Sequence, residues 1–314
     1  MMGQMDPRKA FSEAFAQLGR EYETLIGVSC DSASGGGMSG FQKEFPARVV
    51  EAGISEQNAV TMSAALSKQG FIPVVVAIAP FLTMRAYEQI RDDVGYMNSN
   101  VKIVGSGGGL AYSTLGSTHQ AVEDVALMRT IPNMTIFAPC DAYDVKMALR
   151  FAVERKGPVY IRMPRQPREI ISDERKVVFG KAEELKKGAD LAIFASGPMV
   201  EEAQIAAEIL KKDGIDAAVL GFMTVSPLDR EAVSAYAHKM PLIVTVEEHS
   251  LVNGFGSAVA QYLADNRDAP PIHILGIPEG AKNTGPYKEL LNFYGLTGEK
   301  IAGTIQKRVR EMKR

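Results

Sequence analysis

The chain has 314 residues, with 35 basic and 37 acidic side chains and a formal net charge of −2. This near balance excludes a strongly basic, nucleic-acid-binding surface as the dominant feature. Hydrophobic residues make up 46% and charged residues 23%, which is typical of a globular protein and excludes disorder over most of the chain. The length favours about two domains.

The sequence carries no signal for a membrane or for secretion. The longest nearly unbroken apolar run, residues 71–82, is too short to span a bilayer and is expected to be a buried strand. Residues 1–10 contain no apolar core of the kind that signal peptides have. Cys30 and Cys140 are the only cysteines, so no disulfide framework or zinc spacing exists. We therefore expect a cytoplasmic protein.

The first half alternates short apolar runs with helical patterns. Such alternation predicts a parallel sheet that is covered by helices on both faces. The expected strands are 25–28, 73–78, 101–104, 134–137 and 159–161, and the expected helices are 55–69, 83–97, 119–130 and 142–154.

A second alternating set follows a change of composition. Two prolines and dense charge over residues 164–176 predict an exposed connector, although one long surface loop within a single domain is the alternative. We therefore expect two α/β domains, 1–165 and 181–314, joined by a linker at 166–180. The expected strands of the second domain are 191–195, 217–220, 242–246 and 272–275, and the expected helices are 200–212, 256–264 and 299–312.

Two glycine-rich segments are candidate ligand loops. Residues 35–40 fit the dinucleotide pattern G-x-G-x-x-G, but residues 41–46 carry no helical signal, so we expect a flexible surface loop rather than a nicotinamide site. Residues 105–109 follow an expected strand, at the position where open α/β sheets bind ligands. A tight turn explains that second segment equally well.

Glu56 and His119 are the notable polar residues near expected helix starts. Ser55 is a candidate cap for a helix in which Glu56 lies in the first turn, where the helix dipole favours a carboxylate. Taken alone this is an ordinary helix start. The four histidines have no metal-ligand spacing on one helix face, so we expect no metal site in this chain. His119 is the best candidate for a catalytic or binding histidine.

Many stretches, in one order along nearly the whole chain, resemble the C-terminal half of transketolases, which some organisms encode as a separate chain. The resemblance implies a pyrimidine-binding domain and a transketolase C-terminal domain, in an enzyme that uses thiamine diphosphate to transfer a two-carbon ketol unit between a ketose and an aldose. The stretches are Glu51–Asn58, Tyr87–Arg91, Val101–Val104, Thr118–Gln120, Leu127–Arg129, Pro132–Met134, Gly157–Arg162, Val246–His249 and Gly254–Val259.

The resemblance also implies a partner chain. In this family a Gly-Asp-Gly motif on another domain holds the cofactor's diphosphate and its Mg²⁺ or Ca²⁺, and this chain contains no Gly-Asp-Gly. We therefore expect an inactive chain that needs an N-terminal transketolase subunit. The expected assembly is an α2β2 heterotetramer with each cofactor at a boundary between two chains.

The resemblance assigns cofactor roles to three residues. Glu56 matches the glutamate that hydrogen-bonds the aminopyrimidine ring and favours its imino tautomer, the base that deprotonates the thiazolium carbon. Phe81 matches the aromatic residue that packs on the pyrimidine, and Asp31 matches an aspartate beside the cofactor.

Three further residues match substrate contacts of the family. His119 resembles the histidine that contacts substrate oxygens and assists proton transfer. Arg8 and Arg165 match arginines that hold the anionic end of the sugar, a task suited to the parallel donors of a guanidinium. The alternative for both arginines is ordinary surface charge.

The sequence departs from the family around the substrate channel. Leu115 replaces an aspartate that reads a substrate hydroxyl, and Gly107 replaces a histidine near the phosphate end. Gly35 replaces a serine, Ile78 an aromatic partner of Phe81, and Ser32 a leucine. We therefore expect a non-standard anionic substrate, such as a sulfosugar or a branched sugar phosphate.

Two other classes compete with this interpretation. One is the beta subunit of another thiamine diphosphate enzyme, of the 2-oxo acid dehydrogenase or deoxyxylulose phosphate synthase type, which shares the domain plan. The other is a non-enzymatic regulatory or scaffold chain, against which the retained Glu56 argues.

Overall fold

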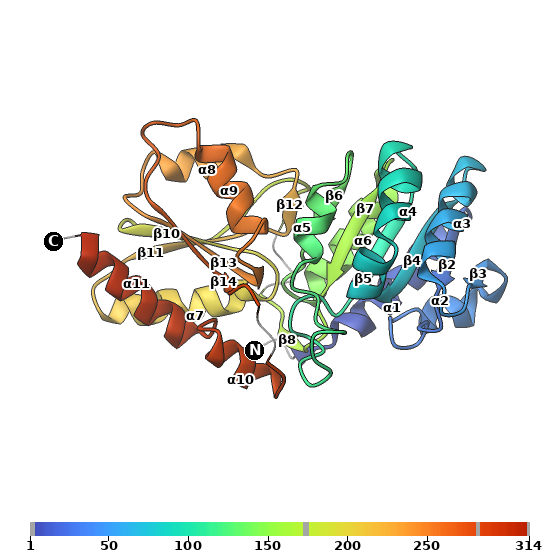
Figure 1. Ribbon diagram of the computed structural model, residues 1–314, viewed down its shortest axis with the longest axis horizontal. Helices are drawn as coiled ribbons and strands as arrows, with labels where there is room; N and C mark the ends of the chain where they lie inside the picture. Colours follow the sequence, from blue (N-terminus) through green and yellow to red (C-terminus); the bar gives the residue numbers. More distant parts are fainter. Residues whose placement is uncertain (1–3, 172–175, 281–282, 313–314) are drawn as a thin grey trace.

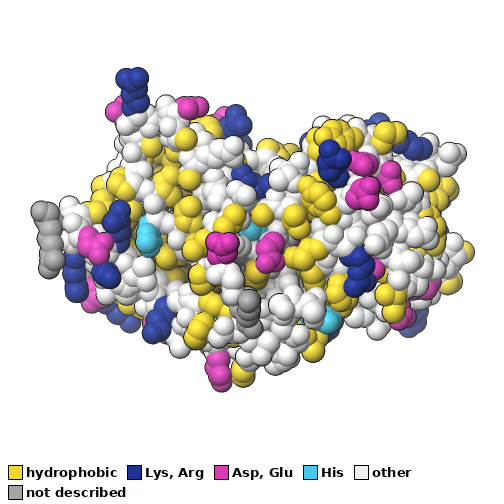
Figure 2. All heavy atoms as spheres, viewed as in Figure 1, with side chains coloured by type: hydrophobic (Ala, Val, Ile, Leu, Met, Phe, Trp, Pro, Cys, Tyr) yellow, Lys and Arg dark blue, Asp and Glu magenta, His cyan; other side chains and the backbone are white. Residues whose placement is uncertain are grey.

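The computed structural model describes residues 4–171, 176–280 and 283–312. It contains two α/β domains side by side, each built on a mostly parallel sheet with helices on both faces, which confirms the predicted fold class (Figure 1). None of the helices in these ranges is long and apolar enough to cross a membrane. On the face drawn in Figure 2, basic and acidic side chains are interspersed, and the surface is notched between the two domains.

The first domain contains a seven-stranded sheet in the order β12-β6-β7-β5-β4-β2-β3. All neighbouring strands are parallel except β12, which runs antiparallel to β6. The strands are β2 (Leu25–Ser29), β3 (Val49–Glu51), β4 (Ile72–Ile78), β5 (Lys102–Ser106), β6 (Thr135–Phe137), β7 (Val159–Met163) and β12 (Thr224–Ser226).

Alternating side chains of the buried strands serve the two faces of this sheet. Val74 and Val76 of β4 belong to the apolar cluster that includes helices α1 and α6, whereas Val75 belongs to the cluster that includes α3 and α5. One face carries α1 (Pro7–Glu21), α2 (Ser39–Glu44) and α6 (Ala142–Glu154), and the other carries α3 (Glu56–Lys68), α4 (Tyr87–Gln89), α5 (Asp124–Arg129) and the π-helical turns Phe81–Arg85 and Ile90–Tyr96.

The second domain contains a five-stranded sheet in the order β14-β13-β10-β11-β9, in which only β9 is antiparallel. Helices α7, α10 and α11 pack on one face and α8 and α9 on the other. The strands are β9 (Glu183–Lys186), β10 (Leu191–Ala195), β11 (Ala217–Gly221), β13 (Ile243–Ser250) and β14 (Ile272–Ile277); the helices are α7 (Met199–Lys212), α8 (Arg230–Ala237), α9 (Phe255–Leu263), α10 (Tyr287–Phe293) and α11 (Gly298–Met312).

Two pairings tie distant parts of the chain together. Strand β1 (Gln4–Met5) pairs antiparallel with β8 (Arg168–Glu169), so the start of the chain lies beside the end of the first domain. Strand β12 follows β11 in the sequence, yet it completes the first domain's sheet by pairing with β6. The first pairing bears on the candidate site, because it fixes the position of residues next to β1 and β8.

Three local predictions are wrong. The helix expected at 119–130 begins only at Asp124, because residues 116–119 form a turn in which His119 N donates to Gly116 O and Gly116 has φ +78. Ser55 does not cap α3 with its side chain; its Oγ donates to Ala52 O instead. Residues 39–44 are the helix α2 rather than a flexible loop, because the buried Phe41 ring stacks on Phe15 at 4.1 Å.

The connector was predicted from residues 164–176, of which 172–175 lie outside the described ranges. The prediction of exposure is wrong at Arg168, which is buried and forms an ion pair with Glu201 of α7. Its guanidinium also donates to the Tyr287 hydroxyl at 2.9 Å. This arginine therefore fastens the end of the first domain to the second.

Candidate functional site

Most of the candidate residues gather at the carboxyl ends of β2, β4 and β5. Asp31 follows β2, Ile78 ends β4, and Ser106 ends β5. Together with the glycine turn 35–36 they line a cavity of about 400 Å³. The edge at which parallel strands end is the usual ligand side of an open α/β sheet. The remaining lining residues are Ser32, Ala33, Ser34, Gln42, Glu51, Ala77 and Tyr112.

Glu56 is a buried carboxylate beside an exposed surface. It is the first residue of α3, and its side chain is only 2% exposed. The Arg85 guanidinium donates to its Oε2 at 2.8 Å. Ile54, two residues earlier, is 74% exposed. The helix N-terminus and Arg85 both favour negative charge at this carboxylate, at a place that the chain itself leaves partly uncovered.

Aromatic rings connect Glu56 to the other candidates. The Arg85 guanidinium lies 4.3 Å from the centroid of the Phe81 ring, and that ring meets His119 edge-on with centroids 5.2 Å apart. The His119 ring in turn lies 5.9 Å from the ring of Tyr112. His119 Nδ1 is 2.9 Å from Thr118 Oγ1. The structure therefore brings Glu56, Phe81 and His119 into one neighbourhood, although the sequence places them on separate elements.

Sequence reasoning gave no role to Glu51, which positions two candidate segments. Its Oε1 accepts hydrogen bonds from Asp31 N at 2.7 Å and from Gly53 N at 2.9 Å. Burial alone would raise the pKa of Glu51, but hydrogen bonds from Asp31, Ser29 and Gly53 outweigh burial and lower it. Asp31 has left-handed backbone geometry with φ +52. The carboxylate of Glu51 thus ties the Asp31 turn to the turn that precedes Glu56.

The two candidate arginines lie together because β1 pairs with β8. Arg8 follows β1 and Arg165 precedes β8. The Arg8 guanidinium is already engaged by Asp6, with Nη2–Oδ2 at 2.6 Å and Nε–Oδ1 at 3.1 Å. Arg165 Nη1 donates to the Tyr112 hydroxyl at 2.9 Å, and its guanidinium lies 4.5 Å from that ring's centroid. Neither Asp6 nor Tyr112 was identified from the sequence.

The residues that depart from the family pattern lie on the same loop. Leu115 is 54% exposed, and Leu115 N donates to Tyr112 O at 3.0 Å. Gly107 has φ +76, and a β-carbon there would lie 2.7 Å from Cδ2 of Tyr112. The ring of Tyr112 thus fills the space that a side chain at position 107 would need.

A buried polar network anchors this loop to the second domain. Glu248 of β13 accepts from Leu110 N at 2.5 Å and from the Tyr287 hydroxyl at 2.6 Å. Complete burial raises the pKa of Glu248, although Arg162 and Tyr287 oppose the shift. Arg162 of β7 pairs with the buried Asp124 at 2.8 Å and donates to Glu248 O at 2.8 Å. The second domain therefore holds the glycine-rich segment 105–109 and the loop that follows it.

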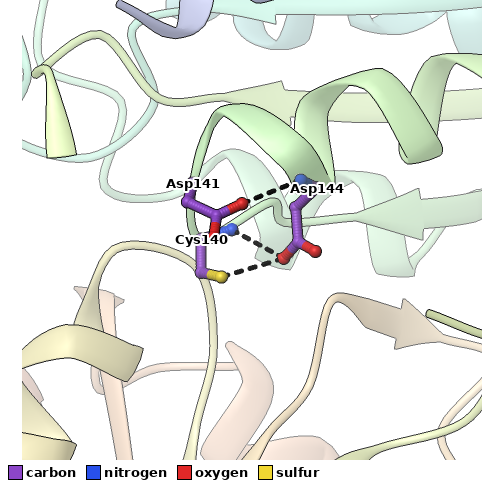
Figure 3. Close-up of side chains that lie close together, drawn as sticks. All are labelled: Cys140, Asp141 and Asp144. Atoms are coloured by element: carbon purple, nitrogen blue, oxygen red, sulfur yellow. Dashed lines mark hydrogen bonds between the residues drawn. The ribbon is translucent and has the colours of Figure 1, made fainter. Parts of the chain in front are cut away.

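Cys140, Asp141 and Asp144 form a separate compact cluster (Figure 3). Among the described residues it is the one group with the spacing of a metal site. Its carboxylates already accept protein donors: Asp141 Oδ1 accepts from Asp144 N at 2.8 Å, and Asp144 Oδ2 accepts from Cys140 N at 3.1 Å and Cys140 Sγ at 2.9 Å. These contacts are those of the cap of helix α6, where Asp141 is the N-cap residue.

The chain matches two families in succession. Residues 3–168 match "Transketolase, pyrimidine binding domain", and residues 180–301 match "Transketolase, C-terminal domain". A solved structure described as "Split gene transketolase, inactive beta4 tetramer" superposes with a TM-score of 0.87 at 36% identity, over 97% of this chain and 98% of that one.

Curated relatives include two-chain transketolases with two different substrates. One of the two chains of the apulose-4-phosphate transketolase of Phocaeicola vulgatus is 38% identical over 95% of each chain. A chain of the 6-deoxy-6-sulfo-D-fructose transketolase of a Clostridium species is 34% identical over 94% of this chain and 91% of its own. The 1-deoxy-D-xylulose-5-phosphate synthase of Heliobacterium modesticaldum is 38% identical over 94% of this chain, which spans only 46% of that protein.

Proposed function

Because the chain belongs to the transketolase family, we propose that it is one subunit of a two-chain transketolase that transfers a two-carbon ketol unit between an anionic ketose and an aldose. In this proposal residues 1–165 form the pyrimidine-binding domain and 181–314 the C-terminal domain, with 166–180 between them. The partner is an N-terminal transketolase subunit, and the assembly is an α2β2 heterotetramer in the cytoplasm.

The observation that carries the proposal is the buried Glu56 carboxylate at a partly uncovered surface. Glu56 is 2% exposed, while Ile54 and Leu115 in the neighbouring loops are 74% and 54% exposed. An apolar rim around a buried charged group is typical of a surface that another chain covers. The residues present fit half of a thiamine diphosphate site: a carboxylate for the pyrimidine ring nitrogen and the Phe81 ring for its face.

Thiamine diphosphate, when bound, supplies an acidic thiazolium carbon and an electron sink. Glu56 holds a proton at the pyrimidine ring nitrogen and so favours the imino tautomer of that ring. Arg85, which pairs with Glu56 at 2.8 Å, positions this carboxylate. His119, beside Phe81, binds substrate oxygens and moves a proton at the substrate hydroxyl. The diphosphate and its Mg²⁺ or Ca²⁺ are held by the partner, since this chain lacks the Gly-Asp-Gly motif.

Substrate selection is assigned to the loops around the cavity. Arg8 and Arg165 bind the anionic end, and Asp31 and Ile78 line the path beside the cofactor. Leu115 has no polar atom to read a substrate hydroxyl, and Gly107, Gly35 and Ser32 change the outline of the channel. This set supports a substrate other than the common pentose phosphates, in keeping with relatives that act on apulose 4-phosphate and on a sulfosugar.

The decisive experiment compares variants at position 56 in the reconstituted two-chain enzyme. Glu56→Gln and Glu56→Ala are expected to lower turnover by at least about 100-fold, since a lost general acid–base group costs roughly that much. Glu88→Gln, on α4, is the matched control and should retain wild-type turnover. Turnover of Glu56→Ala within about threefold of wild type would contradict the assignment.

A deoxyxylulose phosphate synthase-type function is the second candidate, favoured by the 38% identity to such an enzyme. The two candidates differ in the donor. A ketol transferase takes the two-carbon unit from a ketose, whereas the synthase type decarboxylates pyruvate. Release of CO₂ from pyruvate by the assembled enzyme, without transfer from any ketose, would favour the second candidate.

A further inference from the structure

We propose that the anionic end of the substrate carries a single negative charge, as a sulfonate or carboxylate does, and that Asp6 sets this preference. The inference rests on the proposed function, because it takes Arg8 and Arg165 as the groups that hold the anionic end. It adds a specificity-determining residue, Asp6, and narrows the substrate class.

Asp6 neutralises one of the two arginines. Its carboxylate accepts from both Nε and Nη2 of Arg8, at 3.1 and 2.6 Å, so both parallel donors of that guanidinium are occupied. The hydrogen bond from Arg8 lowers the pKa of Asp6 against the effect of partial burial, and the charge of Arg165 acts in the same direction. Asp6 is therefore ionised at every pH at which the enzyme would be assayed.

Arg165 is satisfied without being neutralised. Its partner is the Tyr112 hydroxyl, at 2.9 Å, and its guanidinium stacks on the same ring. A phenol carries no formal charge, so the positive charge of Arg165 is left for a ligand. Asp6, Arg8 and Arg165 together carry one net positive charge.

Tyr112 also prevents position 107 from adding a donor. Gly107 has no side chain, and the Tyr112 ring occupies the volume where one would begin. One net positive charge balances a sulfonate or a carboxylate. A phosphate monoester, which carries nearly two negative charges at neutral pH, leaves an excess negative charge beside Asp6.

Asp6 also has a structural role, which the test must separate from selectivity. It is the N-cap residue of α1, and its Oδ1 accepts from Arg8 N at 2.9 Å. Asn is as good an N-cap residue as Asp. Asp6→Asn therefore keeps the cap and removes only the charge. Glu44→Gln is the matched control, because Glu44 forms a two-point ion pair with Arg20 at the other end of the same helix.

The experiment uses the reconstituted two-chain enzyme and two donors with one carbon skeleton, fructose 6-phosphate and 6-deoxy-6-sulfofructose. The wild type should prefer the sulfonate in kcat/KM. Asp6→Asn should shift the ratio about tenfold toward the phosphate, mainly through KM, as expected for removal of one charge at a half-exposed site. Glu44→Gln should leave the ratio unchanged, and the thermal midpoint of all three proteins should agree.

A wild-type preference for the phosphate, or an unchanged ratio in Asp6→Asn, would overturn the proposal. Failure of the proposed function gives a different result: an assembled complex that transfers ketol units from neither donor. In that case calorimetric binding of the same two sugars to the wild-type and Asp6→Asn complexes decides the charge preference. Equal affinity of the wild type for both sugars would then refute it.

Discussion

The buried ammonium of Lys102 makes the stability of the chain depend on pH. Lys102 lies on β5, the strand that ends at the cavity-lining Ser106, and it is fully buried. Its Nζ donates to Asn100 Oδ1, Arg155 O and Gly157 O at 2.7, 2.7 and 2.8 Å. Burial, with a smaller contribution from the charge of Arg155, lowers the pKa of Lys102 to about 7.

The direction of the effect follows from proton binding in the two states. An unfolded lysine keeps its proton up to about pH 10.4, whereas folded Lys102 releases its proton near pH 7. The unfolded state therefore binds more protons above pH 7, and the free energy of unfolding rises with pH. Between about pH 7 and 8.5 the gain amounts to about 1.6 kcal/mol.

A second buried group sets the upper limit of this window. Burial raises the pKa of the Cys30 thiol to about 12. An unfolded thiol ionises near pH 8.5, so above that pH the unfolded state loses a proton that the folded state keeps. This lowers the free energy of unfolding and opposes the contribution of Lys102. The comparison is therefore restricted to the range below about pH 8.5.

The assay is urea unfolding of the chain at one protein concentration, in steps across that range. Wild-type stability should rise with pH relative to Lys102→Met, which keeps the apolar stem and cannot be protonated. Lys187→Met, at a side chain that is 90% exposed, should run parallel to wild type. Parallel curves for wild type and Lys102→Met would refute the argument, whatever the absolute stability of the variant.

Two further substitutions test the loop and its anchor. Gly107→Ala should lower the thermal midpoint, because its β-carbon overlaps the Tyr112 ring and φ is +76; Gly107→Ala with Tyr112→Ala should recover only part of the loss, and full recovery would argue against backbone strain. Arg162→Met should cost about 3–5 kcal/mol in urea unfolding, because it leaves the buried Asp124 unpaired. Adding Asp124→Asn to Arg162→Met should restore part of that stability, and a further additive loss would contradict the pairing.

The parts that could be predicted from the sequence are those fixed by apolar periodicity. The run that forms β4 and the alternation that forms α6 and α7 depend on burial alone, so their type and approximate bounds were predicted correctly. The helix expected at 119–130 was wrong at its start because Gly116 and the residues after it form a turn, and local polar residues compete with helical hydrogen bonds there.

The parts that could not be predicted depend on contacts between distant residues. Asp6 and Arg165 come together only through the pairing of two-residue strands, β1 with β8, which are too short to leave a pattern. Tyr112 fills the space beside Gly107 through a loop conformation that no periodicity encodes. Glu51 would be expected to be a solvated end of β3, and only the backbone groups of Asp31 and Gly53 explain its position.

Strand β12 limits how the protein can be divided. It lies beyond the second domain's β11 in the chain, yet Thr224 and Ser226 pair with Phe137 and Ile136 of β6, and Ala138 N donates to Met223 O. A truncation that ends after β8 would leave β6 as an open sheet edge, with the backbone groups that β12 covers free to recruit strands from other molecules. Aggregation of such a fragment would reflect this missing strand rather than a poor core, so the two domains are best produced as one polypeptide.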